Sequence, residues 1–300
     1  MEFKRDPRFG RLIPAMVTPF DQNLELDLDR AQALADRLVA GGVDAIIVNG
    51  TTGESPTVFY PQKLELFRAV VKAVAGRVPV IANVGDNCTA DTVYFAADAA
   101  KLGVDGFMCV VPYYNKPPQE GLYRHFKTIA DSTEMPIILY NIPGRCSINM
   151  EAETTLRLAH NCDNIVAIKE ASGDLEQVKA IIDNAPDKFD VYSGDDAATL
   201  DIMRLGGAGV ISTIGNVAPA RMKEIVEAAA AGDWETAEAA NEALMPLMKG
   251  LFATANPILV KEALKLIGFP VGGVRLPLVD ATPAQSATLA QVMREVGVLD

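Results

Sequence analysis

Short apolar runs recur along the chain up to residue 212, and most are followed by a polar turn and then by a segment with helical periodicity. Runs without alternating polar positions are typical of strands that are buried on both faces of a parallel sheet. The predicted strands are residues 12–17, 45–48, 78–82, 106–111, 137–140, 165–169, 190–193 and 209–212. Amphipathic segments between them predict helices, for example at residues 29–40, 61–75, 91–102, 120–130 and 175–184.

The succession of these elements predicts a fold of the α/β class, a (β/α)8 TIM barrel. Several predicted helices end in glycine just before the next strand, at Gly41, Gly103 and Gly206, as helices with a left-handed C-cap do. The alternative is an open doubly wound sheet. Such a sheet usually carries a Gly-x-Gly-x-x-Gly turn after an early strand, and this sequence has none.

The C-terminal part of the chain lacks strand-like runs. Residues 234–250, 254–267 and 283–296 are instead predicted to be helices. We therefore expect a catalytic barrel at residues 1–232 and a C-terminal helical region at residues 233–300 that packs on the barrel. This second region is too small and too continuous in composition with the first to be an independent functional module.

Charge and composition exclude several classes of function. A net charge of −12 argues against a nucleic-acid partner, because such proteins present a basic face. The four cysteines include no C-x-x-C pair, and His125 and His160 have no second ligand at metal spacing, so no metal site is expected. No apolar run approaches the length of a transmembrane helix, and the first eleven residues lack the apolar core of a signal peptide. A cytoplasmic protein without a membrane partner is expected.

Lys169 stands where the sixth predicted strand ends, after the apolar run at residues 165–168. Active sites of (β/α)8 barrels lie at this end of the strands. Burial there disfavours the ammonium form and lowers the pKa of the lysine, and a neutral amine can attack a carbonyl carbon to form a Schiff base. The alternative is that Lys169 extends into solvent and pairs with Glu170.

Other strand ends carry side chains that suit a keto-acid site. Thr51 and Thr52, bracketed by glycines, offer hydroxyls and backbone N–H groups for a carboxylate, although an ordinary turn explains them equally well. Tyr114 follows the fourth strand and could equally be a packing residue. Tyr140 ends the fifth strand, and Arg145 beyond it has a planar fork suited to a carboxylate. Together with a lysine amine, these groups form a class I aldolase-type site.

Several motifs in a fixed order carry a resemblance to a known family. They are Gly50-Thr-Thr-Gly-Glu54, Pro112-Tyr-Tyr-Asn115, Tyr140-Asn-Ile-Pro143, Ile168-Lys-Glu170, Ser193-Gly-Asp-Asp196, Asn256-Pro-Ile258 and Arg275-Leu-Pro277. With these motifs the chain resembles the dihydrodipicolinate synthase/N-acetylneuraminate lyase family over essentially its whole length. The resemblance implies a homotetramer, built as a dimer of dimers, that needs no metal or organic cofactor.

The resemblance also implies roles for the catalytic residues. Lys169 would form the Schiff base with pyruvate, and Tyr140 would shuttle protons in a relay with Thr52 and Tyr114. Tyr114 would reach across a dimer interface into the neighbouring subunit's site. A barrel that only binds a keto acid, as a regulator or scaffold, is a further alternative, but such a protein need not retain the whole relay.

The substrate contacts follow from the same resemblance. Thr51 and Thr52 would meet the pyruvyl carboxylate, and Gly194 and Ile211 would line the pocket through their backbone. Arg145 favours the synthase branch, where an arginine at this place binds the carboxylate of L-aspartate 4-semialdehyde, the second substrate on the route to diaminopimelate and lysine. The alternative is an aldolase for 2-keto-3-deoxy sugar acids or N-acetylneuraminate, which generally has an apolar residue there.

A second cleft, for an allosteric L-lysine effector, is implied as well. Its candidate residues are Tyr60, Lys63, Asn87, Asp91 and Tyr113. Lysine-inhibited members carry histidines in the stretch that here holds Tyr60 and Lys63, and an ammonium from Lys63 would repel a lysine effector. Weak or absent inhibition by L-lysine is therefore expected.

Overall fold

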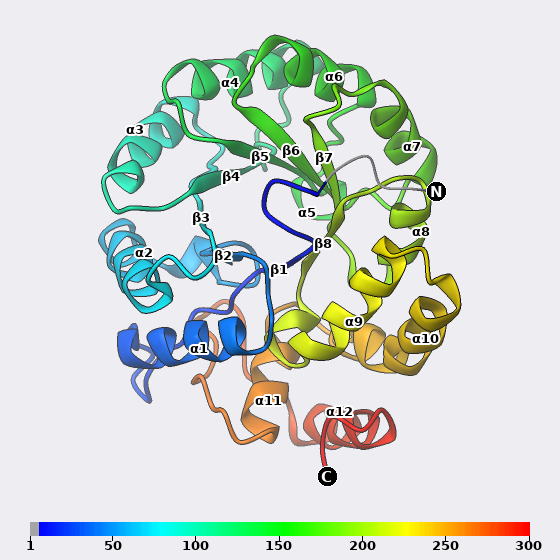
Figure 1. The fold of residues 1–300 in the computed structure, drawn as a ribbon. Coiled ribbons are helices and arrows are strands. Elements are labelled where there is room, and N and C mark those ends of the chain that lie inside the picture. Colours follow the sequence, from blue (N-terminus) through cyan, green and yellow to red (C-terminus); the bar gives the residue numbers. More distant parts are fainter. Residues whose placement is uncertain (1–5) are drawn as a thin grey trace.

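The computed structural model describes residues 6–300 and shows eight parallel strands that curl into a barrel (Figure 1). The strands are β1 Leu12–Pro14, β2 Ile46–Val48, β3 Val80–Asn83, β4 Gly106–Val110, β5 Ile137–Asn141, β6 Ile165–Glu170, β7 Asp190–Ser193 and β8 Gly209–Ser212. Each strand pairs with its neighbours in the order β1-β8-β7-β6-β5-β4-β3-β2. A single bridge between Ala15 and Ile47 closes the gap between β1 and β2. The predicted (β/α)8 fold class is confirmed.

Helices surround the strands as an outer ring (Figure 1). They are α1 Leu28–Ala40, α2 Tyr60–Val74, α3 Thr89–Ala100, α4 Gln119–Asp131, α6 Ala152–Asn161, α7 Leu175–Asn184, α8 Thr199–Arg204 and α9 Pro219–Ala230, and α5 Pro143–Cys146 is a single turn. Asp27 and Asp174 begin α1 and α7 by accepting hydrogen bonds from backbone N–H groups of the first turn. These caps, together with the helix-ending glycines, explain why the local sequence forms compact strand–helix units.

Most element boundaries differ from the sequence expectation by one or two residues, and two larger differences have a clear physical reason. β1 ends at Pro14 because the next residues change partner: Ala15 N–H still bonds to β8, whereas Met16 N–H bonds to Ile47 of β2. The helix expected at residues 254–267 begins only at Ile258, and its earlier start was wrong. Proline lacks an N–H group and disfavours helical backbone in the residue before it, so Pro257 delays the helix.

The hydrophobic core has two layers, separated by the strands. Alternate strand residues point into the barrel and fill it, among them Ile13, Ile47, Ile81, Met108, Ile138, Tyr140, Tyr192 and Ile211. The intervening residues, such as Leu12, Ile46 and Ile168, point outward and pack against the helices. This alternation places Tyr140 inside the barrel at the end of an otherwise apolar strand.

The C-terminal region forms α10 Trp234–Gly250, α11 Ile258–Leu266 and α12 Pro283–Glu295. Buried residues of these helices, including Leu247, Leu259 and Met293, belong to the same hydrophobic cluster as the outer layer of the barrel. A division of the chain after residue 232 stays a prediction. Within residues 6–300, no helix has both the length and the apolar character that crossing a bilayer requires.

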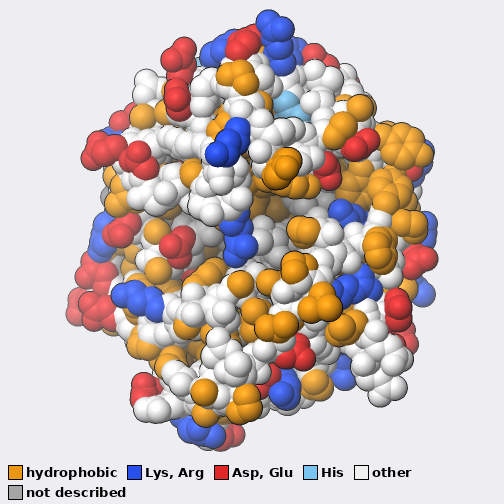
Figure 2. Space-filling view, turned by 180° about the vertical axis from the view of Figure 1, so that it is seen from behind, with side chains coloured by type: hydrophobic (Ala, Val, Ile, Leu, Met, Phe, Trp, Pro, Cys, Tyr) orange, Lys and Arg blue, Asp and Glu red, His pale blue; other side chains and the backbone are white. Residues whose placement is uncertain are grey.

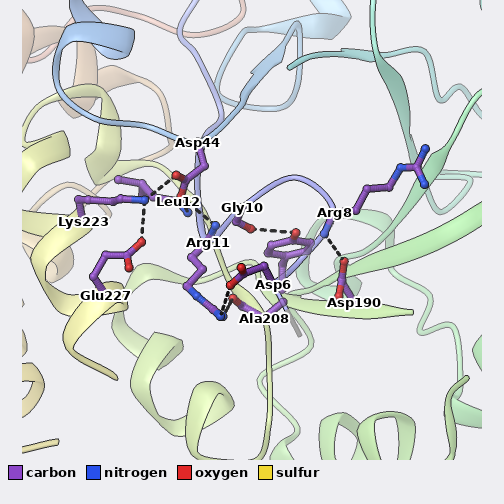
Figure 3. A network of polar contacts seen from close by, with 11 residues as sticks. Asp6, Arg8, Gly10, Arg11, Leu12, Asp44, Asp190, Ala208, Lys223 and Glu227 are labelled. Carbon is purple, nitrogen blue, oxygen red and sulfur yellow. Dashed lines mark hydrogen bonds and ion pairs between the residues drawn. The ribbon is translucent and has the colours of Figure 1, made fainter. Parts of the chain in front are cut away.

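The segment before β1 covers the end of the barrel where the strands begin (Figure 3). Asp44 accepts a hydrogen bond from Arg11 N–H at 2.8 Å and forms an ion pair with Lys223 at 2.5 Å. Asp190, at the start of β7, accepts from Arg8 N–H at 3.0 Å. These polar contacts hold residues 8–11 across this end of the barrel.

Candidate active site

The opposite face, where the strands end, is hollowed near its centre, and Lys and Arg side chains lie beside the hollow (Figure 2). A cavity of about 400 Å³ lies at these strand ends. Its lining includes Thr51, Ser55, Lys63, Asp86, Tyr113, Tyr140, Arg145 and Cys146. Hydroxyl, phenol, guanidinium and ammonium groups therefore meet in one recess, as ligand sites of these barrels do.

Lys169 lies on β6 directly beside Tyr140 of β5, because the two residues are partners in the parallel register. Both side chains are buried, with exposed fractions of 6% and 3%. The Lys169 Nζ atom is 4.3 Å from the centroid of the Tyr140 ring. The sheet register thus brings an amine and a phenol together inside the barrel mouth. Lys169 does not extend into solvent.

The pKa of Lys169 is lowered to about 8, mainly by burial; the carboxylate of Asp196 opposes this shift, and the guanidinium of Arg145 contributes to it. Compared with an ordinary lysine, a shift of this size raises the neutral fraction at neutral pH by roughly a few hundredfold. A neutral amine is the form that attacks carbonyl carbon. Lys169 therefore has the protonation behaviour of a Schiff-base lysine.

Tyr140 has the opposite character, since burial raises the pKa of its phenol to about 12, although a hydrogen bond to Thr51 and the charge of Arg145 oppose the shift. The phenol therefore keeps its proton at neutral pH and can donate it to an oxygen that develops negative charge. Thr51 lines the same cavity and is the hydroxyl next to this phenol.

Thr52 occupies a different position from the one expected for a member of the relay. Its Oγ1 accepts a hydrogen bond from Asn256 Nδ2 at 2.8 Å, and both residues are buried. The structure therefore brings Thr51, rather than Thr52, to the phenol of Tyr140. Asn256 is a site residue that sequence reasoning did not single out, although it stands in one of the motifs of the resemblance.

The C-terminal region also fixes the loop that carries both threonines. Glu54, with a left-handed backbone (φ 54°), forms an ion pair with Lys261 of α11 at 2.6 Å, and each side chain is at most 3% exposed. The second carboxylate oxygen of Glu54 accepts from Arg275 N–H at 2.9 Å. Arg275 Nη1 also donates to the carbonyl of Thr57 at 2.8 Å. The loop geometry thus depends on residues more than 200 positions away.

Replacing Lys261 with methionine should lower the free energy of unfolding by about 3–5 kcal/mol, because the Glu54 carboxylate would remain buried without its cation. Lys265→Met is the matched control on the same helix, since the Lys265 side chain is 65% exposed and its ion pair with Glu262 lies at the surface. The control should change the free energy of unfolding by less than about 1 kcal/mol. Urea denaturation measures both values, and equal values for the two variants would contradict this assignment.

The remaining expected contact residues lie at neighbouring strand ends. Arg145 stands on α5, just after β5, and lines the cavity. Gly194 follows β7, where a Cβ atom would lie 3.2 Å from Lys169 Cε and 2.7 Å from Ala171 Cβ, so glycine leaves room for the lysine. Ile211 of β8 points into the barrel interior. All three therefore lie around the mouth that Lys169 enters.

Tyr114 differs from these residues, because its side chain is 90% exposed and its backbone is left-handed (φ 74°). Within a single chain it lies at the surface, whereas its neighbour Tyr113 lines the cavity. An aromatic side chain held outward in this way is suited to contact another subunit. Its expected role in the relay stays a prediction.

Of the expected effector residues, Lys63 and Tyr113 line the same cavity as Tyr140. Asn87 Nδ2 donates to the carbonyl of Tyr113 at 3.1 Å. The hydroxyl of Tyr60 donates to Asp98 at 2.9 Å. Asp91 belongs to the first turn of α3.

Asp86 also lines the cavity, and sequence reasoning missed it. It accepts from the Tyr113 hydroxyl at 3.3 Å. Its charge opposes the lowering of the Lys63 pKa that burial causes. An acidic residue in a loop beyond β3 gave no signal that would separate it from an ordinary turn residue.

Comparison with known proteins agrees with this geometry. The model of the Dihydrodipicolinate synthetase family matches residues 8–296. The chain belongs to this family. The 4-hydroxy-tetrahydrodipicolinate synthase of Symbiobacterium thermophilum is 52% identical over 293 residues, which are 98% of this chain and 100% of that protein. The enzyme of the same name from Moorella thermoacetica is 53% identical over 97% of this chain and 100% of its own length.

Solved structures of the family are similarly close. The dihydrodipicolinate synthase of Cyanidioschyzon merolae, crystallised with lysine bound, superimposes with a TM-score of 0.96 at 47% identity. The alignment covers 98% of this chain and 100% of that one. The relatives are lyases, and they share the fold over its whole length, including the C-terminal helices.

Proposed function

We propose that this chain is a 4-hydroxy-tetrahydrodipicolinate synthase that condenses pyruvate with L-aspartate 4-semialdehyde. The observation that carries the proposal is the buried Lys169, with its lowered pKa, in register with the proton-retaining phenol of Tyr140. Relatives at 52% and 53% identity over nearly the whole chain bear this name, which supports the choice of reaction.

The first half of the reaction follows from the chemistry of the two groups. The neutral amine of Lys169 attacks the keto carbon of pyruvate, and the carbinolamine loses water to give the imine. Tyr140 donates the proton that the departing hydroxyl needs and later recovers one, with Thr51 as the neighbouring hydroxyl in the relay. Backbone N–H groups and hydroxyls of the loop at residues 51–53 hold the pyruvyl carboxylate.

The second half uses the imine as an electron sink. Loss of a proton from the former methyl carbon gives an enamine, which adds to the aldehyde carbon of the semialdehyde. The amino group of the added substrate then attacks the imine carbon, and the ring closes as the amine of Lys169 leaves. One water molecule is released overall, and the lysine is regenerated.

The specificity of the second step is assigned to Arg145, because its guanidinium lines the cavity beside Tyr140 and can bind the semialdehyde carboxylate. Arg145→Ala should raise the semialdehyde KM by roughly 10- to 100-fold and leave the pyruvate adduct intact. Arg124→Ala, on the exposed surface of α4, is the control. A condensation assay with both substrates measures the effect, and unchanged semialdehyde kinetics would rule out this role.

The same assay separates the alternative within the family. An aldolase for 2-keto-3-deoxy sugar acids or N-acetylneuraminate would release pyruvate from those acids and would show no condensation with the semialdehyde. It would also have no evident use for a cavity guanidinium. Condensation without sugar-acid cleavage is the result that the synthase assignment requires.

The proposed assembly is a homotetramer, a dimer of dimers. Three exposed aromatic side chains support a contact with another subunit: Phe59 is 71% exposed, Tyr94 65% and Tyr114 90%. Hydrophobic side chains gather on this face of the molecule over the side of α2 and α3 (Figure 2). Contiguous apolar surface of this kind marks interaction sites on soluble proteins.

A further inference from the structure

Glu170 directly follows Lys169 on β6, so its side chain leaves the strand on the opposite face, away from the barrel interior. It is 1% exposed. Its carboxylate accepts from Asn141 Nδ2 at 3.1 Å on both oxygens, from Ser172 N–H at 2.8 Å and from Gln177 Nε2 at 3.1 Å. Burial raises its pKa, and within the described residues neutral donors oppose that shift.

Two of these donors, Asn141 and Gln177, belong to a closed ring of four side chains that also includes Asn149 and Glu170. Asn141 Nδ2 also donates to Asn149 Oδ1 at 2.8 Å, and Asn149 Nδ2 donates to Gln177 Oε1 at 2.7 Å. Gln177 Nε2 in turn donates to Glu170, so this series of hydrogen bonds ends on the carboxylate. The carboxylate can only accept, so it orients both amides that face it and, through them, Asn149.

The ring lies one residue beyond the reacting pair. Tyr140 is the register partner of Lys169, and Asn141 is the register partner of Glu170. The Asn141–Glu170 contact therefore ties the ends of β5 and β6 together immediately after the phenol and the amine. Glu170 also accepts from Gly194 N–H through its backbone carbonyl at 2.7 Å, which extends the tie to β7.

Among residues 6–300, the groups that donate to the buried Glu170 carboxylate are neutral, and an apolar side chain would pack there at lower electrostatic cost. The carboxylate fixes the orientation of the amides, since its hydrogen bonds form only when the NH2 groups of Asn141 and Gln177 face it. We propose that Glu170 is a positioning residue whose ring with Asn141, Asn149 and Gln177 holds Lys169 and Tyr140 in reacting geometry. This proposal rests on the Schiff-base function proposed above.

The test exchanges the hydrogen-bond donors and acceptors of the ring. Glu170→Gln places an amide NH2 group against the NH2 groups of Asn141 and Gln177. The double variant Glu170→Gln/Asn141→Asp exchanges donor and acceptor. Flips of the Asn149 and Gln177 amides then close the ring again, although the Met150 carbonyl loses its weaker contacts with Asn141 and Gln177 at 3.4 and 3.3 Å. The readout is the rate of borohydride-trapped pyruvate adduct on Lys169 at saturating pyruvate, measured by mass spectrometry beside the melting temperature.

Glu170→Gln should slow adduct formation roughly 10- to 100-fold, as small misplacements of reacting groups do, with little change in the half-saturating pyruvate concentration. The double variant should form the adduct several-fold faster than Glu170→Gln alone, because the ring closes again even though the Met150 carbonyl loses its donors. Glu176→Gln, an exposed acid in the first turn of α7, should react like the wild type. If Glu170→Gln does not fold, Gln177→Leu removes one donor and should slow the reaction several-fold.

A merely structural carboxylate would give a lower melting temperature but wild-type adduct formation by the folded fraction, and that result would overturn the proposal. A double variant as slow as the single one would also overturn it. Absence of any adduct in the wild type would instead remove the proposed function, so the two failures are distinguishable.

Discussion

Lys169→Ala should abolish the pyruvate adduct and lower kcat for condensation by on the order of 10⁵-fold or more, the scale seen when a catalytic nucleophile is removed. The reason is chemical: Lys169 is the buried amine in register with Tyr140, and its lowered pKa of about 8 supplies the neutral form. Steady-state kinetics with pyruvate and the semialdehyde measure the loss.

Lys179→Ala is the control for this substitution, because Lys179 lies on the helix that follows β6 and its side chain is 50% exposed in a pair with Asp183. It should leave kcat within about twofold, since surface ion pairs contribute little. A Lys169→Ala enzyme that kept more than a hundredth of the wild-type kcat would contradict the nucleophile assignment.

Tyr140→Phe should lower kcat by roughly 10²–10⁴-fold, the range expected when a general acid–base group is lost. The ring would still fill the barrel interior, so the free energy of unfolding should change little, whereas the proton donor would be gone. In the wild type, the Tyr140 phenol has a pKa of about 12 and so stays protonated throughout the neutral range. Kinetics and thermal melting together separate the catalytic effect from the structural one.

Two further variants sharpen this prediction. Tyr123→Phe, on α4 away from the cavity, should behave like the wild type. Thr51→Val should also be slow, and the double variant with Tyr140→Phe should be no slower than Tyr140→Phe alone, because both residues act in one relay. Fully additive losses would show that Thr51 and Tyr140 act independently.

Strand periodicity was enough to predict the barrel, and barrel topology was enough to place Lys169, Tyr140 and Arg145 at one end. Buried parallel strands read as continuous apolar runs, and their ends converge whatever the details of the helices. The register that sets Lys169 beside Tyr140 could not be read locally, because it depends on how two strands 25 or more residues apart pair.

The positions of Thr51 and Thr52 could not be predicted from the local sequence. Which hydroxyl faces the phenol depends on the left-handed backbone at Asn49 and Glu54, with φ values of 63° and 54°. The Glu54 side chain is held by Lys261 and Arg275, far along the chain. No pattern around residues 49–54 contains that information, so the expected relay through Thr52 could not be distinguished from one through Thr51.

The C-terminal region also contacts the loop that carries both threonines. Its helices were expected to pack on the barrel, and Asn256, just before α11, donates to Thr52, while Lys261 of α11 pairs with Glu54. In the sequence, a polar residue beside a proline, such as Asn256, resembles an ordinary turn residue, and only the three-dimensional contacts show which group it bonds.

Borohydride reduction of the wild-type protein with pyruvate, followed by peptide mapping, tests whether Lys169 forms a Schiff base with pyruvate. We expect one reduced pyruvyl adduct per chain, located on Lys169, with a rate of formation that rises with pH through about 8 as the amine loses its proton. No adduct, or an adduct on another lysine, would contradict this expectation.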